Sequence, residues 1–76
     1  MKELVEFLAK SLVDSPDDVR VHTYDREDAT VIELEVAESD LGKVIGRQGR
    51  TARAMRTVLA AAGQKARRRY VLDIVD

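Results

Sequence analysis

The feature that most constrains this fold is a four-residue loop, Gly46-Arg47-Gln48-Gly49, which interrupts an otherwise helical stretch of the chain. Glycine has no Cβ and accepts backbone conformations that other residues avoid. Two glycines three residues apart therefore predict a tight bend that another backbone can approach closely. Just before the loop, the sequence predicts a short helix over 41–45, with Ser39 or Asp40 as its N-cap.

A longer helix is predicted to begin after Gly49, to run to about Ala62 and to stop at Gly63. Small and apolar residues recur there at spacings of three and four, which gives the helix one buried side: Ala52, Met55, Leu59 and Ala62.

The segment 2–13 predicts a first helix that ends before Pro16, because proline cannot continue a helical hydrogen-bond ladder. Its apolar residues lie at helical spacing: Leu4, Val5, Leu8 and Leu12. Two alternating, β-rich segments follow, 19–24 and 30–36, and the polar turn between them predicts a hairpin.

In the second strand Ile32, Leu34 and Val36 share one face, so one side of the sheet is expected to be buried. The segment 69–75 predicts a third strand, with Tyr70, Leu72 and Ile74 toward the helices. The resulting fold class is α+β in the order α-β-β-α-α-β, with a three-stranded sheet and three helices packed on one face.

Length and composition indicate one domain over residues 1–76. A chain of this length buries only roughly 60% of its unfolded surface, so its core is thin and dimerisation would help it. Cysteine is absent, which excludes disulfides and thiolate metal sites. No apolar run approaches the length of a membrane span and no signal pattern opens the chain, so we expect a cytoplasmic protein.

Charge is distributed unevenly along the chain. Residues 1–38 hold four Lys or Arg against eleven Asp or Glu, whereas residues 39–76 hold nine against three. The second half therefore suits a partner of negative charge. The helix after Gly49 opens with unpaired N–H groups that favour an anion. Four cations are expected to surround a phosphate chain there: Lys43, Arg47, Arg50 and Arg53.

The segment Val44-Ile45-Gly46-Arg47-Gln48-Gly49-Arg50 resembles the I-G-x-x-G signature of KH domains, whose loop clamps about four nucleotides of RNA. The element order resembles the type II arrangement, and the whole chain resembles the bacterial stand-alone KH-domain protein A family. This resemblance implies that Gly46 and Gly49 admit the RNA backbone and that Arg47 and Gln48 lie at the tip.

The resemblance further implies a cleft between the loop with its flanking helices and the second strand. The family puts its apolar floor at the positions of Leu41, Val44, Ile45 and Ile32, and at least some of these four must instead fill the protein's own core. It also implies self-association, or pairing with a larger KH-containing protein. The implied role is that of an RNA chaperone or post-transcriptional regulator touching cell shape and envelope synthesis.

Other interpretations of these residues were weighed. His22 is the only histidine, and no cysteine or second histidine completes a metal site with it. No acidic pair has a nucleophile or base beside it, and the loop lacks both the Gly-Lys-Ser/Thr ending of an ATP-binding loop and the three-glycine spacing of an NAD site. We therefore expect neither an enzyme nor a cofactor. Arg67-Arg68-Arg69 is expected to be a solvated edge, and Phe7 and Tyr70 are expected in the core. A helix-turn-helix duplex-DNA module and a dimerisation scaffold remain the alternatives.

Overall fold

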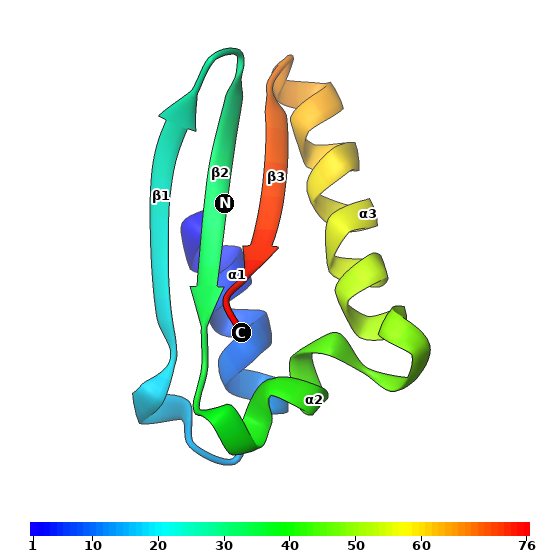
Figure 1. Cartoon of the computed structure of the whole chain (residues 1–76). Coiled ribbons are helices and arrows are strands. Elements are labelled where there is room, and N and C mark those ends of the chain that lie inside the picture. Colours follow the sequence, from blue (N-terminus) through cyan, green and yellow to red (C-terminus); the bar gives the residue numbers. More distant parts are fainter.

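The computed structural model describes the whole chain, residues 1–76, and is built around a three-stranded mixed sheet (Figure 1). Strands β1 (Arg20–Arg26) and β2 (Ala29–Glu35) form an antiparallel hairpin with a tight turn. Strand β3 (Arg69–Ile74) pairs in parallel with the other edge of β2. The sheet order is β1-β2-β3, so β2 is the central strand.

The helices are α1 (Lys2–Leu12), α2 (Leu41–Ile45) and α3 (Arg50–Ala66), and all lie on one side of the sheet (Figure 1). The predicted order and layers are therefore confirmed. Short 3-10 turns precede β1 and α2, and another links α2 to α3. No helix is both long and apolar enough to cross a membrane.

The core lies between the sheet and the helices, as the alternation in β2 predicted. Ile32 and Leu34 are fully buried there. Side chains from the other elements complete this cluster: Val5, Ala9, Val19, Val21, Val44, Met55, Leu59 and Leu72. The opposite face of the sheet carries no helix, and β2 and β3 place Glu33 and Asp73 side by side on it.

The predicted end of the long helix at Gly63 is wrong, because α3 continues to Ala66. Gly63 lies inside the helix, where a side chain would collide with the backbone carbonyl of Arg68. The helix is closed instead by Arg67, whose φ of +56° is left-handed, and by an N–H of Arg68 that donates to the Gly63 carbonyl at 2.7 Å.

Phe7 was expected in the core, and this prediction is wrong, because 67% of its surface is exposed. On α1 the buried positions are Val5 and Ala9, and Phe7 points away from them. Tyr70 is half-buried and packs against the core cluster, in agreement with its predicted position.

Candidate nucleic-acid interface

The bend between α2 and α3 depends on Gly46. Its φ of +79° and ψ of 169° belong to a region that only glycine adopts readily. A Cβ on Gly46 would also collide with the side chain and backbone nitrogen of Thr51. The N–H of Gly46 donates to the Gly42 carbonyl at 2.8 Å, and the N–H of Gly49 donates to the Gly46 carbonyl at 3.1 Å. These bonds hold the chain in a closed turn.

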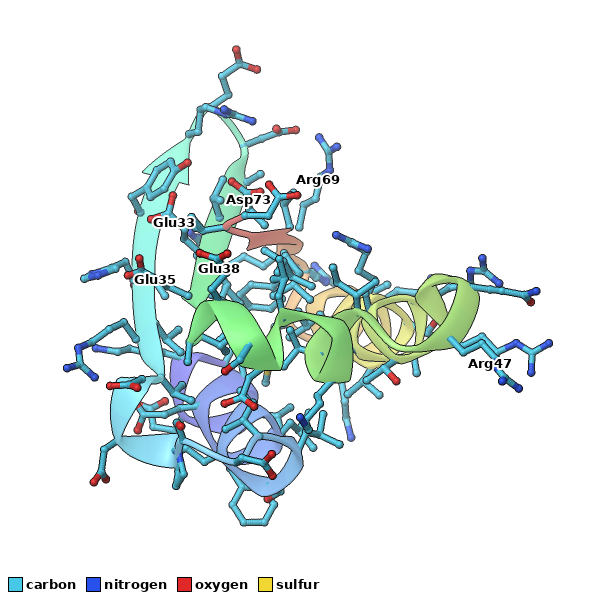
Figure 2. All side chains as sticks on the ribbon, turned by 60° about the horizontal axis from the view of Figure 1, so that its bottom comes forward. Glu33, Glu35, Glu38, Arg47, Arg69 and Asp73 are labelled. Carbon is cyan, nitrogen blue, oxygen red and sulfur yellow. The ribbon has the colours of Figure 1, made fainter.

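The tip of this turn is open to solvent. Arg47 and Gln48 are exposed, and Gln48 has a left-handed φ of +57°. Gly49 has a φ of +74°, and the space where its Cβ would stand is empty to 4 Å. Figure 2 shows Arg47 projecting from the end of the molecule, away from the sheet. Another backbone therefore has room to approach Gly49.

The start of α3 offers positive charge and free donors. No side chain caps this helix, but the N–H of Arg50 already donates to the Arg47 carbonyl of the preceding turn, so what the rest of the first turn offers an anion is the positive end of the helix dipole. Arg50 and Arg53 are exposed, and neither forms an ion pair. The sequence from 41 to 72 contains no Asp or Glu. An anion at this end of α3 therefore meets cations, and no carboxylate of α2 or α3 competes with it.

Lys43 differs from these arginines because its charge is already paired. Its Nζ lies 3.2 Å from Oδ2 of Asp14 and 3.4 Å from Oδ1 of Asp40. The hydrogen bond and charge of Asp14, with the weaker contribution of Asp40, raise the pKa of Lys43. The structure therefore does not present Lys43 as a free cation beside Arg47 and Arg50.

Asp40 is the buried charged residue that sequence reasoning did not single out beyond a capping role. Only 1% of it is exposed, and no side-chain bond caps α2. Its carboxylate instead accepts the N–H groups of Asp14 at 3.2 Å and Ser15 at 3.0 Å. Burial alone would raise the pKa of Asp40, but these two bonds and Lys43 outweigh it and lower the pKa. Asp40 thereby ties the loop that follows α1 to the start of α2.

The four residues expected at the apolar floor of the cleft differ in how far they are exposed. Val44 and Ile32 are fully buried, so they are the members of this set that fill the protein's own core, and Val44, which was also expected to contact RNA, has no surface to offer a ligand. Val44 instead anchors the five-residue α2. Leu41 and Ile45 are half-buried, and they remain available at the surface.

The strand beside α3 is β3, whereas a hollow next to Leu41 of α2 is lined by Glu35 and Val36 at the end of the second strand. Because β2 is central, β3 lies at the edge of the sheet next to α3 (Figure 1). Nη2 of Arg56 donates to the Leu72 carbonyl at 3.3 Å, which links α3 to this strand. Strand β3 therefore flanks α3, and the end of β2 flanks α2.

Of the three consecutive arginines at 67–69, Arg68 has structural partners. Its Nη2 donates to Oδ1 of Asp25 at 2.8 Å, and its guanidinium also donates to the Thr30 hydroxyl. No group of histidine, cysteine or acidic side chains is arranged to hold a metal ion.

Comparison with known proteins gives a match over nearly the whole chain. Residues 2–74 match the family model described as KhpA/KhpB, KH domain. A protein of Halalkalibacterium halodurans called RNA-binding protein KhpA is 57% identical over 76 residues, which cover 100% of both chains. Proteins with the same name from Aquifex aeolicus and Borreliella burgdorferi are 53% and 51% identical, covering 100% and 97% of this chain and 96% and 90% of theirs. No solved structure matches.

Proposed function

Because this chain belongs to the KhpA/KhpB family of KH domains, we propose that it binds single-stranded RNA at the loop Gly46–Gly49. The observation that carries the proposal is the open space at Gly49, next to an uncapped helix and the exposed arginines. Relatives that share about half of its residues are named RNA-binding proteins. The mode of binding that we propose is a clamp on about four unpaired nucleotides.

In this clamp the phosphates lie over the turn. A phosphate oxygen accepts N–H groups from the first turn of α3, where the helix dipole favours negative charge. Arg47, Arg50 and Arg53 surround the same strand and form charge-assisted hydrogen bonds with the neighbouring phosphates. Gln48 offers an amide at the tip to sugar or base edges.

The bases face α2 and the edge of β3. Leu41 and Ile45 supply half-buried apolar contact, and Arg56 lies against β3 at Leu72. If about three phosphates are neutralised, log K falls against log salt with a slope near −2, from about −0.7 per contact on a single strand. An affinity that does not change with salt would contradict a phosphate clamp.

The decisive variant is Arg47→Asp with Gln48→Asp. Both side chains are exposed, so the fold survives while carboxylates repel the phosphates at the tip. We expect RNA affinity to fall by more than about 100-fold, measured by fluorescence anisotropy, with an unchanged circular dichroism spectrum. Lys2→Asp, a charge reversal at the start of α1, is the control and keeps the affinity. RNA binding retained by the folded double variant would refute the clamp.

Duplex DNA is titrated in the same experiment. A helix-turn-helix module would prefer the duplex, with α3 in the major groove. The short α2 and the glycine bend between α2 and α3 instead favour a single strand. Preference for duplex DNA would therefore replace the proposal with that alternative.

We further propose that the chain associates with a second copy or with a larger KH-containing protein. The surface where α1 meets α3 supports this proposal, because Phe7, Leu12 and Val58 are exposed apolar side chains. A hollow of about 260 Å³ lies there, lined by Leu8, Ser11, Leu12, Thr51, Ala54, Met55 and Val58. Val58→Glu is expected to give a monomer by analytical ultracentrifugation, whereas an unchanged mass would exclude this surface.

In the cell we propose a cytoplasmic role as an RNA chaperone or post-transcriptional regulator, with effects on cell shape and the envelope. Crosslinking in cells, followed by sequencing of the attached RNA, tests this role. Envelope-related transcripts crosslinked to the native chain but absent from the Arg47→Asp, Gln48→Asp variant would support it. No recovery of RNA above the variant's background would overturn it.

A further inference from the structure

We propose that the open face of the sheet, the side without helices, pairs weakly with the same face of a second copy of the chain. All three helices lie on the other side of the sheet, and so does the hollow between α1 and α3 where Val58 is exposed. The open face is therefore a separate surface for self-association. The pairing follows a two-fold axis that crosses the strands, so that rows of unlike charge meet.

The alternation and register of the strands decide which side chains stand on the open face. Ile32 and Leu34 point into the core, so Val31 and Glu33 point the other way. Residues paired across the strands share a face, and they form three rows: Glu33 with His22 and Asp73, Val31 with Tyr24 and Val71, and Ala29 with Arg26 and Arg69. We call these the acidic row, the apolar row and the basic row.

The apolar row crosses the middle of the face. Tyr24 is 43% exposed, whereas Val31 between the outer strands is only 2% exposed although it is not part of the core cluster. Val71 is half-buried beside it. Parallel strands are usually covered on both faces, yet the parallel pair β2 and β3 has helices on one side only. The apolar row is therefore where a second layer of structure would pack.

The charges of the outer rows have no partner within the chain. No ion pair of the chain includes Glu33, Asp73, Arg26 or Arg69. Arg69 and Asp73 are separated along β3 by about 13 Å, at 3.3 Å per residue, which is too far for them to pair with each other. Figure 2 shows both near Glu33 and well away from α1. These charges are therefore available to a partner that presents the opposite sign.

A second copy presents charges in the order that fits. A two-fold axis along the apolar row reverses the strands and turns one face onto the other, so the apolar row faces itself and each acidic row faces a basic row. Asp73 of one copy then faces Arg69 of the other, and symmetry makes this contact twice. Stacked sheets lie about 10 Å apart, a gap that a carboxylate and a guanidinium bridge. An axis along β2 would instead set acidic row on acidic row.

The small size of the face makes the pairing weak. Strands of six or seven residues give a footprint of roughly 23 by 14 Å, or about 650 Å² for two copies, whereas stable complexes bury at least about 1,200 Å². We expect a dissociation constant on the order of 100 µM. Val58→Glu therefore remains a monomer at about 5 µM and pairs through the sheet only near about 500 µM. Both helix layers lie outside such a pair, so the loop Gly46–Gly49 of each copy stays free.

Charge reversals on β3 test this register. Asp73→Arg makes both positions of the strand basic, and Arg69→Asp makes both acidic. Both side chains are exposed, so the variants are expected to fold, which circular dichroism checks. Each is made in the Val58→Glu chain, which removes association between α1 and α3 and changes nothing if that surface does not associate. Masses are measured by sedimentation equilibrium from about 5 to about 500 µM.

We expect the parent Val58→Glu chain to pair and each single reversal to weaken pairing by at least about tenfold, because like charges then meet twice. The double variant Arg69→Asp with Asp73→Arg restores unlike contacts and should recover the mass of the parent. A one-to-one mixture of the two single variants should also pair, although neither pairs alone. Lys65→Asp, a reversal at an exposed position of α3, is the control and should keep the parent's behaviour.

The opposite results would overturn the pairing of sheet faces. A parent chain that stays a monomer at about 500 µM would exclude it, and would leave the loop clamp and the surface between α1 and α3 as they stand. Single reversals that pair as the parent does would exclude the contact of Asp73 with Arg69. A mixture of the single variants that stays monomeric would also contradict the two-fold arrangement. If a reversal to arginine does not fold, Asp73→Lys takes its place in the same mixture.

Discussion

The side of the molecule formed by the loop and α3 differs sharply in charge from the open face of the sheet. The first carries Arg47, Arg50 and Arg53 in a stretch without a single acidic residue. The second carries Glu33 and Asp73 beside each other, with Glu35 and Glu38 nearby, and it carries both signs of charge because Arg69 lies there too (Figure 2). The whole chain has a net charge of −1, which conceals this separation. A region that carries cations and no acidic residue, set against a face of mixed charge, directs a polyanion to one side of a nearly neutral protein.

The largest expected loss of RNA affinity comes from Gly46→Ala. This substitution deforms the loop on the basic side of the molecule without changing any charge. A Cβ there collides with Thr51 and forces alanine into a glycine-only conformation, at a cost of about 3 kcal/mol. We expect RNA affinity to fall by about 100-fold, measured by anisotropy where thermal melts show the folded state.

Gly42→Ala is the matched control for this variant. Gly42 lies inside α2 with empty space around its Cβ position, so alanine should stabilise the helix by up to about 1 kcal/mol. RNA affinity should stay the same. Equal losses of affinity in the two variants would show that the loop geometry does not matter.

The next largest change in RNA affinity is expected when charge is removed from α3 and from the open face of the sheet in separate variants. Arg50→Gln with Arg53→Gln should weaken RNA binding by about tenfold and lower the magnitude of the salt slope by about 1.4, from two lost contacts at about 0.7 each. Glu33→Gln with Asp73→Asn changes the open face by the same amount, and should strengthen binding by less than about twofold.

Both double variants are titrated at several salt concentrations with the same RNA. Equal and opposite changes would mean that RNA responds only to net charge. The contrast between the two faces would then have no part in binding.

The fold was readable because its signals were local and periodic. The alternation of Ile32 and Leu34 and the helical spacing of Met55 and Leu59 placed the core correctly. Gly63 misled the prediction because a glycine can end a helix or admit a neighbouring backbone, and the approach of Arg68 is a tertiary event. Phe7 misled it because hydrophobicity alone does not say which side of a helix the core covers.

Part of the candidate site could also be predicted from the sequence, because its signals are local. The glycines, Arg47 and Gln48 depend on local loop geometry, and the structure places them at an exposed tip. The partners of Lys43 and the burial of Asp40 were not readable, because Asp14 and Ser15 lie 25 or more residues away in sequence. The strand beside α3 also depended on sheet order, which hydrophobic alternation does not specify.

The next prediction concerns Asp40, which joins the acidic N-terminal part of the chain to α2. Changing it is expected to affect the stability of the fold and not the affinity for RNA. Asp40 accepts the N–H groups of Asp14 and Ser15 in the loop that follows α1, and its pKa is lowered in the folded chain. A lowered pKa stabilises the fold above the ordinary carboxyl value of 3.8, and this contribution is lost as the pH falls through the folded pKa.

The Asp40 contribution is measured by thermal melts of the native chain and of Asp40→Asn from pH 7 down to pH 2. Asparagine should lower the melting temperature at neutral pH by about 8 °C, because it removes charge-assisted bonds. The two curves should converge below pH 4. Curves that stay parallel throughout would show that Asp40 does not titrate as described.

The smallest expected effect on RNA comes from Lys43→Gln, although Lys43 lies only four residues before Arg47. Its ammonium is held by Asp14 and Asp40, so its charge is already balanced and little remains for a phosphate. We expect RNA affinity to change by less than about twofold and the salt slope by much less than the 0.7 of a full contact. Arg47→Gln in the same titration provides the comparison and should show the full change in slope. If Lys43→Gln also changed the salt slope by the full 0.7 of one contact, RNA would have to displace Asp14 from Lys43. The RNA-binding surface would then include Lys43 of α2.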